Sequence, residues 1–353
     1  MKKFCVFSGF LGSGKTTTMM ALTQYLSQHY GKAAMISNDL GRQSLADHKL
    51  ALLAGCNATE LTGSCICYMT DTLAEQLDRL FHMDQCELVI SDIPGFGVGA
   101  LENVYHRLAE RYPGQYPLSP FTVVTEPRSL DLLSQDPQGD IAQILNAQLL
   151  EADLILLNKA DLLSPEDCQR AVAWLETAYP QAQVLSISAV TGQGMDTLAQ
   201  ALLQGTASMH HPAFLQHGCQ HEAAIGRMSE YYLQYYTTVC CKDFDGNAYL
   251  LALAEAVQKS LQGPGWEIPH LKLLAWEPEG DYGKADLLGI HRPIVLTKAL
   301  CHPCSQLAVM VNCSALCPSG ALDAAISQAV DEVSQAYQLS NLIFKKECFS
   351  VGG

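Results

Sequence analysis

The sequence of 353 residues lacks any apolar run approaching the ~20 residues that a membrane-spanning helix needs. The few apolar residues after Met1-Lys2-Lys3 break into a glycine-rich loop, which is unlike a secretory signal. We therefore expect a cytoplasmic protein with no membrane partner. In a reducing compartment its 14 cysteines are better candidates for metal or redox chemistry than for disulfides.

Positive charge is also scarce. Lysine and arginine number 21 against 36 aspartates and glutamates, which gives a formal net charge of −15. Nucleic-acid binding depends mainly on clustered cations, so this balance argues against a nucleic-acid partner. Apolar residues make up 48% of the chain, and its length is sufficient for two domains with separate cores.

The region up to residue 205 alternates short apolar runs with helical stretches. Its predicted strands are residues 3–8, 33–37, 87–91, 121–125, 154–157 and 183–187, and its first predicted helix is residues 16–28. Continuous apolar strands separated by helices predict an α/β domain over residues 1–205, with a mostly parallel sheet flanked by helices. Loops at the carboxyl ends of such strands usually carry the chemistry.

The periodic pattern stops beyond Gly205. Residues 206–225 form a predicted linker, either a polar connector or a metal-collecting tract, that contains His210, His211, His217, Cys219 and His221. Residues 226–353 then predict a smaller C-terminal α+β domain with two helices on one face of a sheet. Its predicted strands are 231–240, 270–276, 285–290, 293–297, 306–311 and 341–345, and its helices are 246–262 and 319–337.

A phosphate-binding loop directly follows the first predicted strand. Residues 9–16 read GFLGSGKT and fit the pattern G-x-x-x-x-G-K-[ST]. Glycines let backbone N–H groups turn toward phosphates at a helix N-terminus. We expect Lys15 to contact the β- and γ-phosphates and the Thr16 hydroxyl to ligate Mg²⁺. The predicted phosphate-binding residues are Gly9, Gly12, Ser13, Gly14, Lys15 and Thr16.

A second motif, Asn158-Lys159-Ala160-Asp161, follows an apolar strand where GTPases read guanine. A carboxylate there accepts hydrogen bonds from the ring N1–H and the exocyclic amine of guanine, whereas adenine would leave it unpaired. Ser188-Ala189 follows the next strand, where a backbone contact to the base is expected. The order of these motifs favours GTP over ATP, although a plain solvated loop is the alternative for residues 158–161.

Asp92-Ile93-Pro94-Gly95 ends another strand. We expect Asp92 near Mg²⁺ and the Gly95 N–H near the γ-phosphate, in a loop released when that phosphate is lost. The alternative is a simple turn. Lys15, Asp92 and Gly95 are thus the candidate catalytic residues. No glutamine follows Gly95 to orient water and no arginine finger is identifiable, so slow intrinsic hydrolysis is expected.

Two cysteines, Cys65 and Cys67, lie between the second and third predicted strands. Thiolates at this spacing can face one soft cation if the segment is extended or looped, with carboxylate or histidine help. Buried, inert cysteines are the alternative.

Together these motifs resemble the CobW-type GTPases, relatives of the UreG and HypB nickel-insertion proteins. The resemblance covers residues 1–205 well and the rest more loosely. It is carried by residues 9–16 with Thr17, by Asn38-Asp39 with Gly41, by Glu60-Leu61 and Cys65-Ile66-Cys67, by Asp92 and Gly95, and by residues 158–161.

The resemblance implies a GTP-hydrolysing metallochaperone or metal insertase that delivers Zn²⁺, Co²⁺ or Ni²⁺ to a client metalloenzyme. Cys65 and Cys67 would then be metal ligands, with Asp39 as an acidic residue near the metal and switch region and Glu60 as a further ligand. Thr17 would join the nucleotide-binding residues. A nucleotide-dependent homodimer is also expected.

Two departures from the family pattern affect the metal site. The family usually has Cys-x-Cys-Cys after Asn-Gly, whereas Gly63-Ser64 precede Cys65 here and Tyr68 replaces the third cysteine. Asp92-Ile93-Pro94 replaces the more usual Glu-Thr-Thr. Two thiolates hold a metal more weakly than three, so we expect transient binding, an ion other than zinc, or help from Cys56, Glu60 or a client.

Other functions remain open at this point. The chain could be a GTP-dependent assembly switch for a metal- or corrinoid-dependent enzyme that carries no metal itself, or a P-loop ATPase or kinase. A further C-x₂-C-x₈-C-x₃-C pattern, formed by Cys301, Cys304, Cys313 and Cys317, fits either a metal cage or ordinary buried cysteines.

Overall fold

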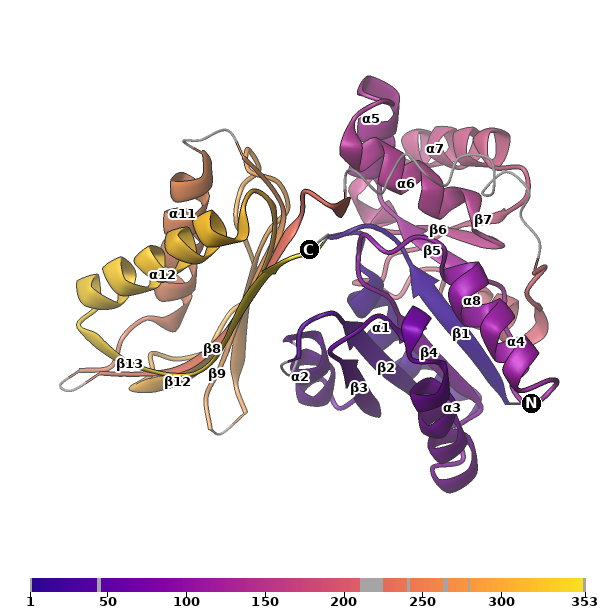
Figure 1. Cartoon of the computed structure of the whole chain (residues 1–353), viewed down its shortest axis with the longest axis horizontal. Coiled ribbons are helices and arrows are strands. Elements are labelled where there is room, and N and C mark those ends of the chain that lie inside the picture. The colour runs from indigo at the N-terminus through magenta and orange to yellow at the C-terminus, as the bar shows by residue number, and fades with distance from the viewer. Residues whose placement is uncertain are drawn as a thin grey trace. The chain divides into compact units, whose positions relative to one another are not determined.

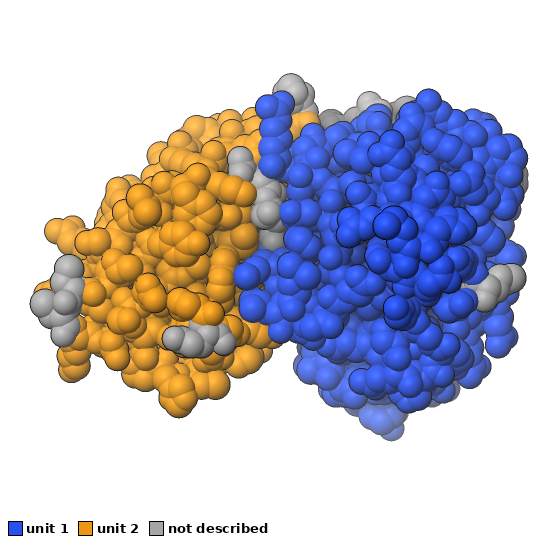
Figure 2. Space-filling model, turned by 90° about the horizontal axis from the view of Figure 1, so that it is seen from below, with its two compact units in different colours: residues 1–224 blue, residues 225–353 orange. Residues whose placement is uncertain are grey.

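The computed structural model describes residues 2–42, 46–209, 225–239, 242–262, 266–278 and 280–351. The chain divides into two compact units, residues 1–224 and 225–353, which are coloured separately in Figure 2. Each unit is described by itself. In the described part of the chain, no helix is both long enough and apolar enough to cross a membrane.

The first unit is built on a seven-stranded sheet with strand order β3-β2-β4-β1-β5-β6-β7 (Figure 1). Every pairing in it is parallel. Its strands are β1 Lys3–Ser8, β2 Ala33–Asp39, β3 Ala58–Thr62, β4 Leu88–Asp92, β5 Thr122–Thr125, β6 Leu154–Leu157 and β7 Gln183–Ser186. The predicted parallel α/β sheet is therefore confirmed.

Helices cover both faces of this sheet. The α-helices are α1 Lys15–His29, α2 Ala46–Leu53, α3 Thr70–Asp78, α4 Arg107–Arg111, α5 Pro127–Gln135, α6 Asp140–Leu150, α7 Pro165–Ala178 and α8 Met195–Gln204. Short turns of other helix types are η1 Ile66–Tyr68, η2 Arg79–Met83, η3 Leu101–His106 and η4 Ala160–Leu162.

Alternate residues of the central strands face the two helical layers. On one side, α1 and α8 bury a cluster against β1, which includes Cys5, Phe7, Met19, Leu22 and Leu198. On the other side, the Tyr105 ring from η3 lies 6.2 Å from that of Phe4 and 5.5 Å from that of Phe121. Because helices cover both faces of the sheet, the sequences of its central strands are continuous apolar runs.

Strand β3 was not predicted. Only Leu61 of its five residues is buried, and the strand lies at the edge of the sheet. An edge strand with one half-covered face gives no continuous apolar run, so its sequence does not stand out from a loop.

The second unit contains an antiparallel six-stranded sheet of order β11-β10-β9-β12-β8-β13. Its strands are β8 Ser229–Val239, β9 Glu267–Trp276, β10 Tyr282–Leu287, β11 Val295–Lys298, β12 Gln306–Leu316 and β13 Leu339–Ser350. Helices α11 Gly246–Gln262 and α12 Ser319–Ala336 lie on one face of this sheet (Figure 1).

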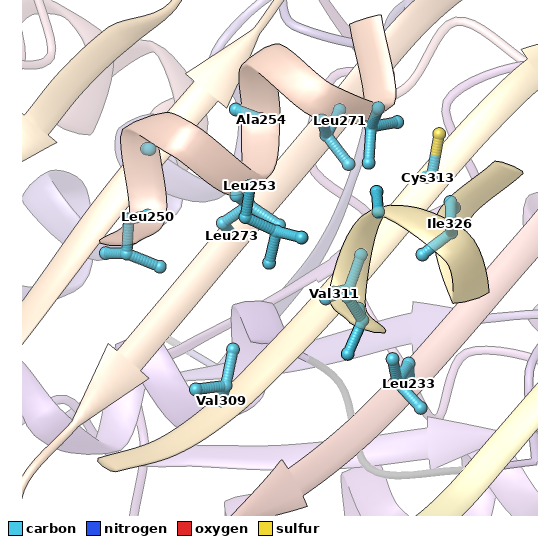
Figure 3. Close-up of a cluster of buried hydrophobic side chains, with 14 of the residues drawn as sticks. Leu233, Leu250, Leu253, Ala254, Leu271, Leu273, Val309, Val311, Cys313 and Ile326 are labelled. Atoms are coloured by element: carbon cyan, nitrogen blue, oxygen red, sulfur yellow. The ribbon is translucent and has the colours of Figure 1, made fainter. Parts of the chain in front are cut away.

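The core of the second unit lies between its sheet and its two helices. Figure 3 shows Leu250 and Leu253 of α11 in one cluster with Leu271 and Leu273 of β9 and Val311 of β12. The predicted α+β unit with two helices on one face is confirmed. The prediction made β12 and β13 too short, because their ends carry polar residues that break the apolar pattern.

Candidate functional site

The phosphate loop connects β1 to α1 at the carboxyl edge of the parallel sheet. Gly9 and Gly14 have φ angles of 134° and 93°, which favour glycine. A Cβ at Gly9 would lie 2.1 Å from the Val124 carbonyl oxygen, and one at Gly14 would lie 2.3 Å from Asn158 Nδ2. No side chain fits at either position, because the loop closely approaches β5 and the loop that holds Asn158.

The loop has the chemistry to accept a phosphate chain. Lys15 Nζ donates to the carbonyl oxygens of Gly9 (2.5 Å) and Phe10 (3.4 Å), so its charge lies over the loop. Among the described residues, the buried Ser13 hydroxyl has no hydrogen-bond partner. Thr16 and Thr17 occupy the first turn of α1 and are partly exposed. Backbone curl, a cation and an unpaired hydroxyl together fit a bound triphosphate.

Asn158 joins the three nucleotide motifs. Its Nδ2 donates to the Ser13 carbonyl oxygen (2.9 Å), and its Oδ1 accepts from the Ala189 N–H (3.1 Å). The residue is buried, with 2% of its surface exposed. The structure therefore brings together the phosphate loop, residues 158–161 and Ser188-Ala189, which are far apart in the sequence.

Lys159 reinforces the same junction. It adopts a left-handed backbone conformation (φ 62°), and its Nζ donates to the Gly12 carbonyl oxygen (2.8 Å) and to Glu126 Oε2 (2.7 Å). The charged pair is mostly buried, with 23% of the Lys159 side chain and 9% of the Glu126 side chain exposed. The aliphatic stem of Lys159 is thereby fixed beside the phosphate loop.

The residues predicted to read the base differ in their exposure. Asp161 lies in η4 and is exposed, so its carboxylate can reach a base. Ser188 is fully buried and accepts a hydrogen bond from the Thr191 N–H (3.2 Å). The Ala189 N–H is already donated to Asn158, so its direct contact with a base stays a prediction.

Asp92 ends β4 beside β1 and β2. Its Oδ1 accepts a hydrogen bond from the Asn38 N–H (2.7 Å), and 7% of the residue is exposed. Burial raises the pKa of Asp92 to about 7, and the negative charges of Asp47 and Asp39 contribute to the increase. A carboxylate that is costly to ionise without a counter-ion fits a place for Mg²⁺.

Gly95 lies against the phosphate loop. A Cβ there would lie 2.5 Å from Leu11 Cδ2 and 3.0 Å from the Leu11 backbone nitrogen. The segment is fastened from α6, where Gln148 Nε2 donates to the carbonyl oxygens of Gly95 (3.1 Å) and Gly97 (2.9 Å). Gly95 therefore lies beside the phosphate loop, and the contacts of Asp92 and Gly95 with bound phosphates stay predictions.

Cys65 and Cys67 lie on the loop after β3 and are 8% and 6% exposed. The Cys67 N–H donates to the Cys65 sulfur (3.3 Å), and the Cys67 thiol also donates to it. These hydrogen bonds lower the pKa of Cys65 and raise that of Cys67. The two sulfur atoms therefore face each other and can approach one ion together.

The carboxylates proposed as further ligands are placed differently. Asp39 ends β2, and its negative charge acts on Cys65. Glu60 is paired with His48 of α2 (3.2 Å between Glu60 Oε2 and His48 Nδ1). Across the residues that the structure describes, no three His, Cys, Asp or Glu side chains are grouped so that they could hold a metal ion. A complete site would need rearrangement or a ligand from a partner, and the metal-ligand assignments stay predictions.

The C-terminal cysteine pattern does not form one cage. Cys304 lies before β12 and Cys313 lies near its other end, and the seven steps from Gln306 to Cys313 span ~23 Å. Cys301 is exposed, whereas Cys304, Cys313 and Cys317 are buried in the core of the second unit. Packing explains the three buried cysteines. The predicted histidine linker, including His210 to His221, lies outside the described residues.

Sequence reasoning missed several residues that shape the site. Glu126 follows β5 at the carboxyl edge of the sheet, a position that could have marked it. Gln148 and Glu151, at the end of α6, carry no local signal. Glu151 is buried and accepts from the N–H groups of Gly99 (2.6 Å) and Leu101 (3.0 Å). The sequence indicates Asn38 only as part of the family motif with Asp39 and Gly41, and its contacts have no local signal.

Comparison with known proteins identifies the first unit. A family model described as CobW/HypB/UreG, nucleotide-binding domain, matches residues 3–186. The chain is 26% identical over 215 residues to the zinc chaperone YeiR of Escherichia coli strain K12, covering 60% of this chain and 63% of that protein. It is 25% identical over 252 residues to zinc-regulated GTPase metalloprotein activator 1 of Dictyostelium discoideum, covering 60% and 51%. The chain thus spans less than two thirds of either relative.

Solved structures resemble it more weakly. The Zn(II)-bound YjiA GTPase from E. coli is 18% identical with a TM-score of 0.38, covering 93% of this chain and 98% of that one. HypB from Helicobacter pylori in complex with nickel is 17% identical with a TM-score of 0.43, covering 57% and 86%. At these scores the likenesses have no bearing on the residues of the site.

Proposed function

Because the chain belongs to the CobW/HypB/UreG family of nucleotide-binding domains, we propose that it is a GTP-hydrolysing metallochaperone that passes a transition metal to a client metalloenzyme. One observation carries this proposal. The loop that holds Cys65 and Cys67 is joined to the nucleotide carboxylate Asp92 through a single residue, Asn38.

The nucleotide part of the proposal rests on the assembled motifs. Asn158 and Lys159 fix the phosphate loop against the base-reading loop, which leaves the Asp161 carboxylate exposed at the rim. A guanine there would satisfy Asp161, whereas adenine would not. Mg²⁺, when bound, would be held by Thr16 and Asp92 and would neutralise charge on the phosphates.

Turnover should be slow. Phe96 follows Gly95 where a water-orienting glutamine would be needed, so positioning and charge stabilisation by Lys15 and Gly95 are left to act on the phosphate. A slow intrinsic rate suits a switch whose hydrolysis is timed by a partner or by cargo.

The metal part rests on the thiol pair and on the relatives. One relative is a zinc chaperone and another is a zinc-regulated metalloprotein activator, which makes Zn²⁺ the first cargo to test, with Co²⁺ and Ni²⁺ next. Two thiolates at Cys65 and Cys67 suit these borderline ions, and the missing third cysteine suits a site that releases its ion.

The first experiment compares nucleotides and metal together. We expect GTP to displace a fluorescent guanine nucleotide far better than ATP does, and Zn²⁺ to change the rate of GTP hydrolysis. The Cys65→Ala/Cys67→Ala double variant should lose the effect of Zn²⁺. The control is Cys168→Ala, which removes a partly exposed thiol on α7 and should behave as the wild type.

Two outcomes would replace the proposal. Unchanged Zn²⁺ affinity and hydrolysis in the double variant would favour an assembly switch that carries no metal. Better competition by ATP would mean that Asn158 and Asp161 do not read guanine, and would favour an ATPase or kinase.

A further inference from the structure

Asn38 is the next-to-last residue of β2 and is 3% exposed. Its backbone N–H donates to Asp92 Oδ1 at 2.7 Å, across the boundary between β2 and β4. This bond fixes one carboxylate oxygen of Asp92. The other oxygen remains for the Mg²⁺ site that the position implies.

The side chain of Asn38 connects to the cysteine loop. Its Nδ2 donates to the carbonyl oxygens of Leu61 (2.9 Å) and Ser64 (2.8 Å). Its Oδ1 accepts from the N–H of Ile66 (2.9 Å), the residue between the two cysteines. Both amide donors and the carbonyl acceptor are therefore used, and all three bonds end on the segment from β3 to Cys67.

Other contacts hold the cysteine loop without reaching Asp92. The Gly63 N–H donates to the Gly41 carbonyl oxygen (2.8 Å), and Arg107 Nη1 donates to the Cys67 carbonyl oxygen (2.9 Å). Arg107 is the first residue of α4. It therefore provides a natural comparison, because its removal would loosen the loop and leave the Asp92 bond in place.

The geometry points to Asn38 as the positioning residue that couples the state of the nucleotide site to the arrangement of Cys65 and Cys67. This inference rests on the proposed function. When Asp92 changes its contacts on nucleotide exchange, the β2 backbone at Asn38 must follow or lose its bond. Because the side chain and the backbone of Asn38 share one Cα, that movement changes three hydrogen bonds that shape the cysteine loop.

A buried hydrogen-bond network of this kind has few intermediate arrangements. Breaking one bond leaves a buried donor or acceptor unpaired, which is energetically unfavourable. The loop therefore either keeps its full set of bonds or moves to another set, and it does not relax gradually. This property suits a loop that holds a metal in one state and releases it in the other.

The test measures coupling and not activity. Co²⁺ is titrated into the full chain, with the thiolate-to-cobalt absorption band as the readout, once with Mg²⁺–GDP and once with a non-hydrolysable GTP analogue. We expect the wild-type Co²⁺ affinity to differ between the two states by about 5–150-fold, the usual range of coupling between two sites. In Asn38→Leu we expect that ratio to fall below about twofold.

The matched control is Arg107→Met, which removes a loop contact of similar length but has no bond to Asp92. We expect it to weaken Co²⁺ binding in both states and to preserve the ratio between them. Asn38→Ser, which keeps a small polar side chain, should retain part of the ratio and replaces Asn38→Leu if that variant does not fold. GDP affinity, measured without metal, should remain within about threefold in all variants, because the backbone bond to Asp92 is kept.

The possible failures can be told apart. A wild-type chain with equal Co²⁺ affinity in both nucleotide states would overturn the proposed function and the coupling role together. A wild-type ratio that persists in Asn38→Leu and Asn38→Ser would overturn only the role of Asn38. Equal loss of the ratio in Arg107→Met would show that any loosening of the loop suffices, and Asn38 would then be merely structural.

Discussion

At the scale of single residues, we expect nucleotide specificity to depend on a few polar atoms at one edge of a sheet. Asn158 and Lys159 use their side chains to hold loops together, so we expect Asp161 to read the base. These different roles for Asn158 and Asp161 are expected from their burial. Asn158 is buried and hydrogen-bonded to two other loops, whereas Asp161 is exposed.

We expect Asp161→Asn to weaken binding of GDP at least about tenfold and to improve binding of xanthosine diphosphate relative to GDP. An amide would present a donor where guanine also presents one, whereas the C2 carbonyl of xanthine can accept from it. Calorimetry with both nucleotides measures the change. Asp167→Asn, which alters the N-terminal turn of α7, is the control and should leave both affinities unchanged. An unaltered preference for GDP in Asp161→Asn would remove Asp161 from the base site.

At the scale of elements, the segment that follows β4 is held by two residues at the end of α6. Glu151 accepts hydrogen bonds from the N–H groups of Gly99 and Leu101, at the start of η3. Gln148 donates hydrogen bonds to the carbonyl oxygens of Gly95 and Gly97. Charge-assisted bonds to a buried carboxylate are among the stronger hydrogen bonds in proteins. The end of α6 therefore sets how easily the Asp92–Gly95 region can rearrange.

In Glu151→Gln, we expect the stability of the first unit to fall by about 1–3 kcal/mol, because a neutral acceptor replaces a charged one. The amides of Gly99 and Leu101 should exchange faster with deuterium, while those of the phosphate loop should change little. Urea unfolding and hydrogen exchange measure both effects. The exposed Glu166→Gln substitution on α7 is the control. Unchanged exchange at residues 99 and 101 would contradict this role.

In the second unit, one ion pair on β10 makes stability depend on pH. Burial alone would raise the pKa of Asp286, but the charges of Lys284, His270 and Lys272 lower it below its ordinary value. Because the folded pKa is the lower one, the stabilisation is present above about pH 4 and is lost as the pH falls further. The carboxylate also accepts from Thr297 Oγ1 (2.9 Å).

Asp286→Asn should therefore destabilise the second unit by about 3–5 kcal/mol at pH 7, since Lys284 loses a partner in a mostly buried pair. The difference from the wild type should shrink between pH 5 and about pH 2. Urea unfolding followed by tryptophan fluorescence measures it, since Trp266 and Trp276 belong to this unit. Asp323→Asn, which breaks the half-exposed Lys346 pair, should cost within about 1 kcal/mol at any pH. The interpretation fails if the Asp286→Asn difference is the same at pH 7 and pH 2.

At the scale of the whole molecule, two units with separate cores share one chain. The first buries its core between a parallel sheet and two helical layers, and the second buries its core between an antiparallel sheet and two helices. The nucleotide motifs and the Cys65–Cys67 pair all belong to the first unit. Nucleotide binding is therefore expected to act mainly on that unit.

We expect Mg²⁺–GDP at 100 times its dissociation constant to stabilise the first unit by about 2.7 kcal/mol. The most protected amides of β1 and β6 should then exchange more slowly, while those of β8 and β12 should not change. Hydrogen exchange read segment by segment measures this, and Lys15→Ala, which removes the phosphate-binding cation, is the control. Equal protection of both units on GDP binding would show that they unfold as one.

Some features of this protein were determined by the sequence alone. The parallel sheet, the smaller α+β unit with its two helices and the order of the nucleotide motifs follow from apolar periodicity and from short local patterns, because strand, helix and phosphate loop each have a signature within a few residues. The edge strand β3 was not predicted, because a half-exposed strand lacks a continuous apolar run.

Other features were decided only by the tertiary structure. The bond from Asn38 to Asp92 spans 54 residues, those to the cysteine loop span 23–28 residues, and the Asn158 bond to Ser13 spans 145. The separation of Cys304, before β12, from Cys313, near the other end of that strand, could likewise not be predicted from the cysteine spacing. Local patterns determine which elements form, but partners that meet across a sheet depend on strand order and register, which arise only when distant segments pack together.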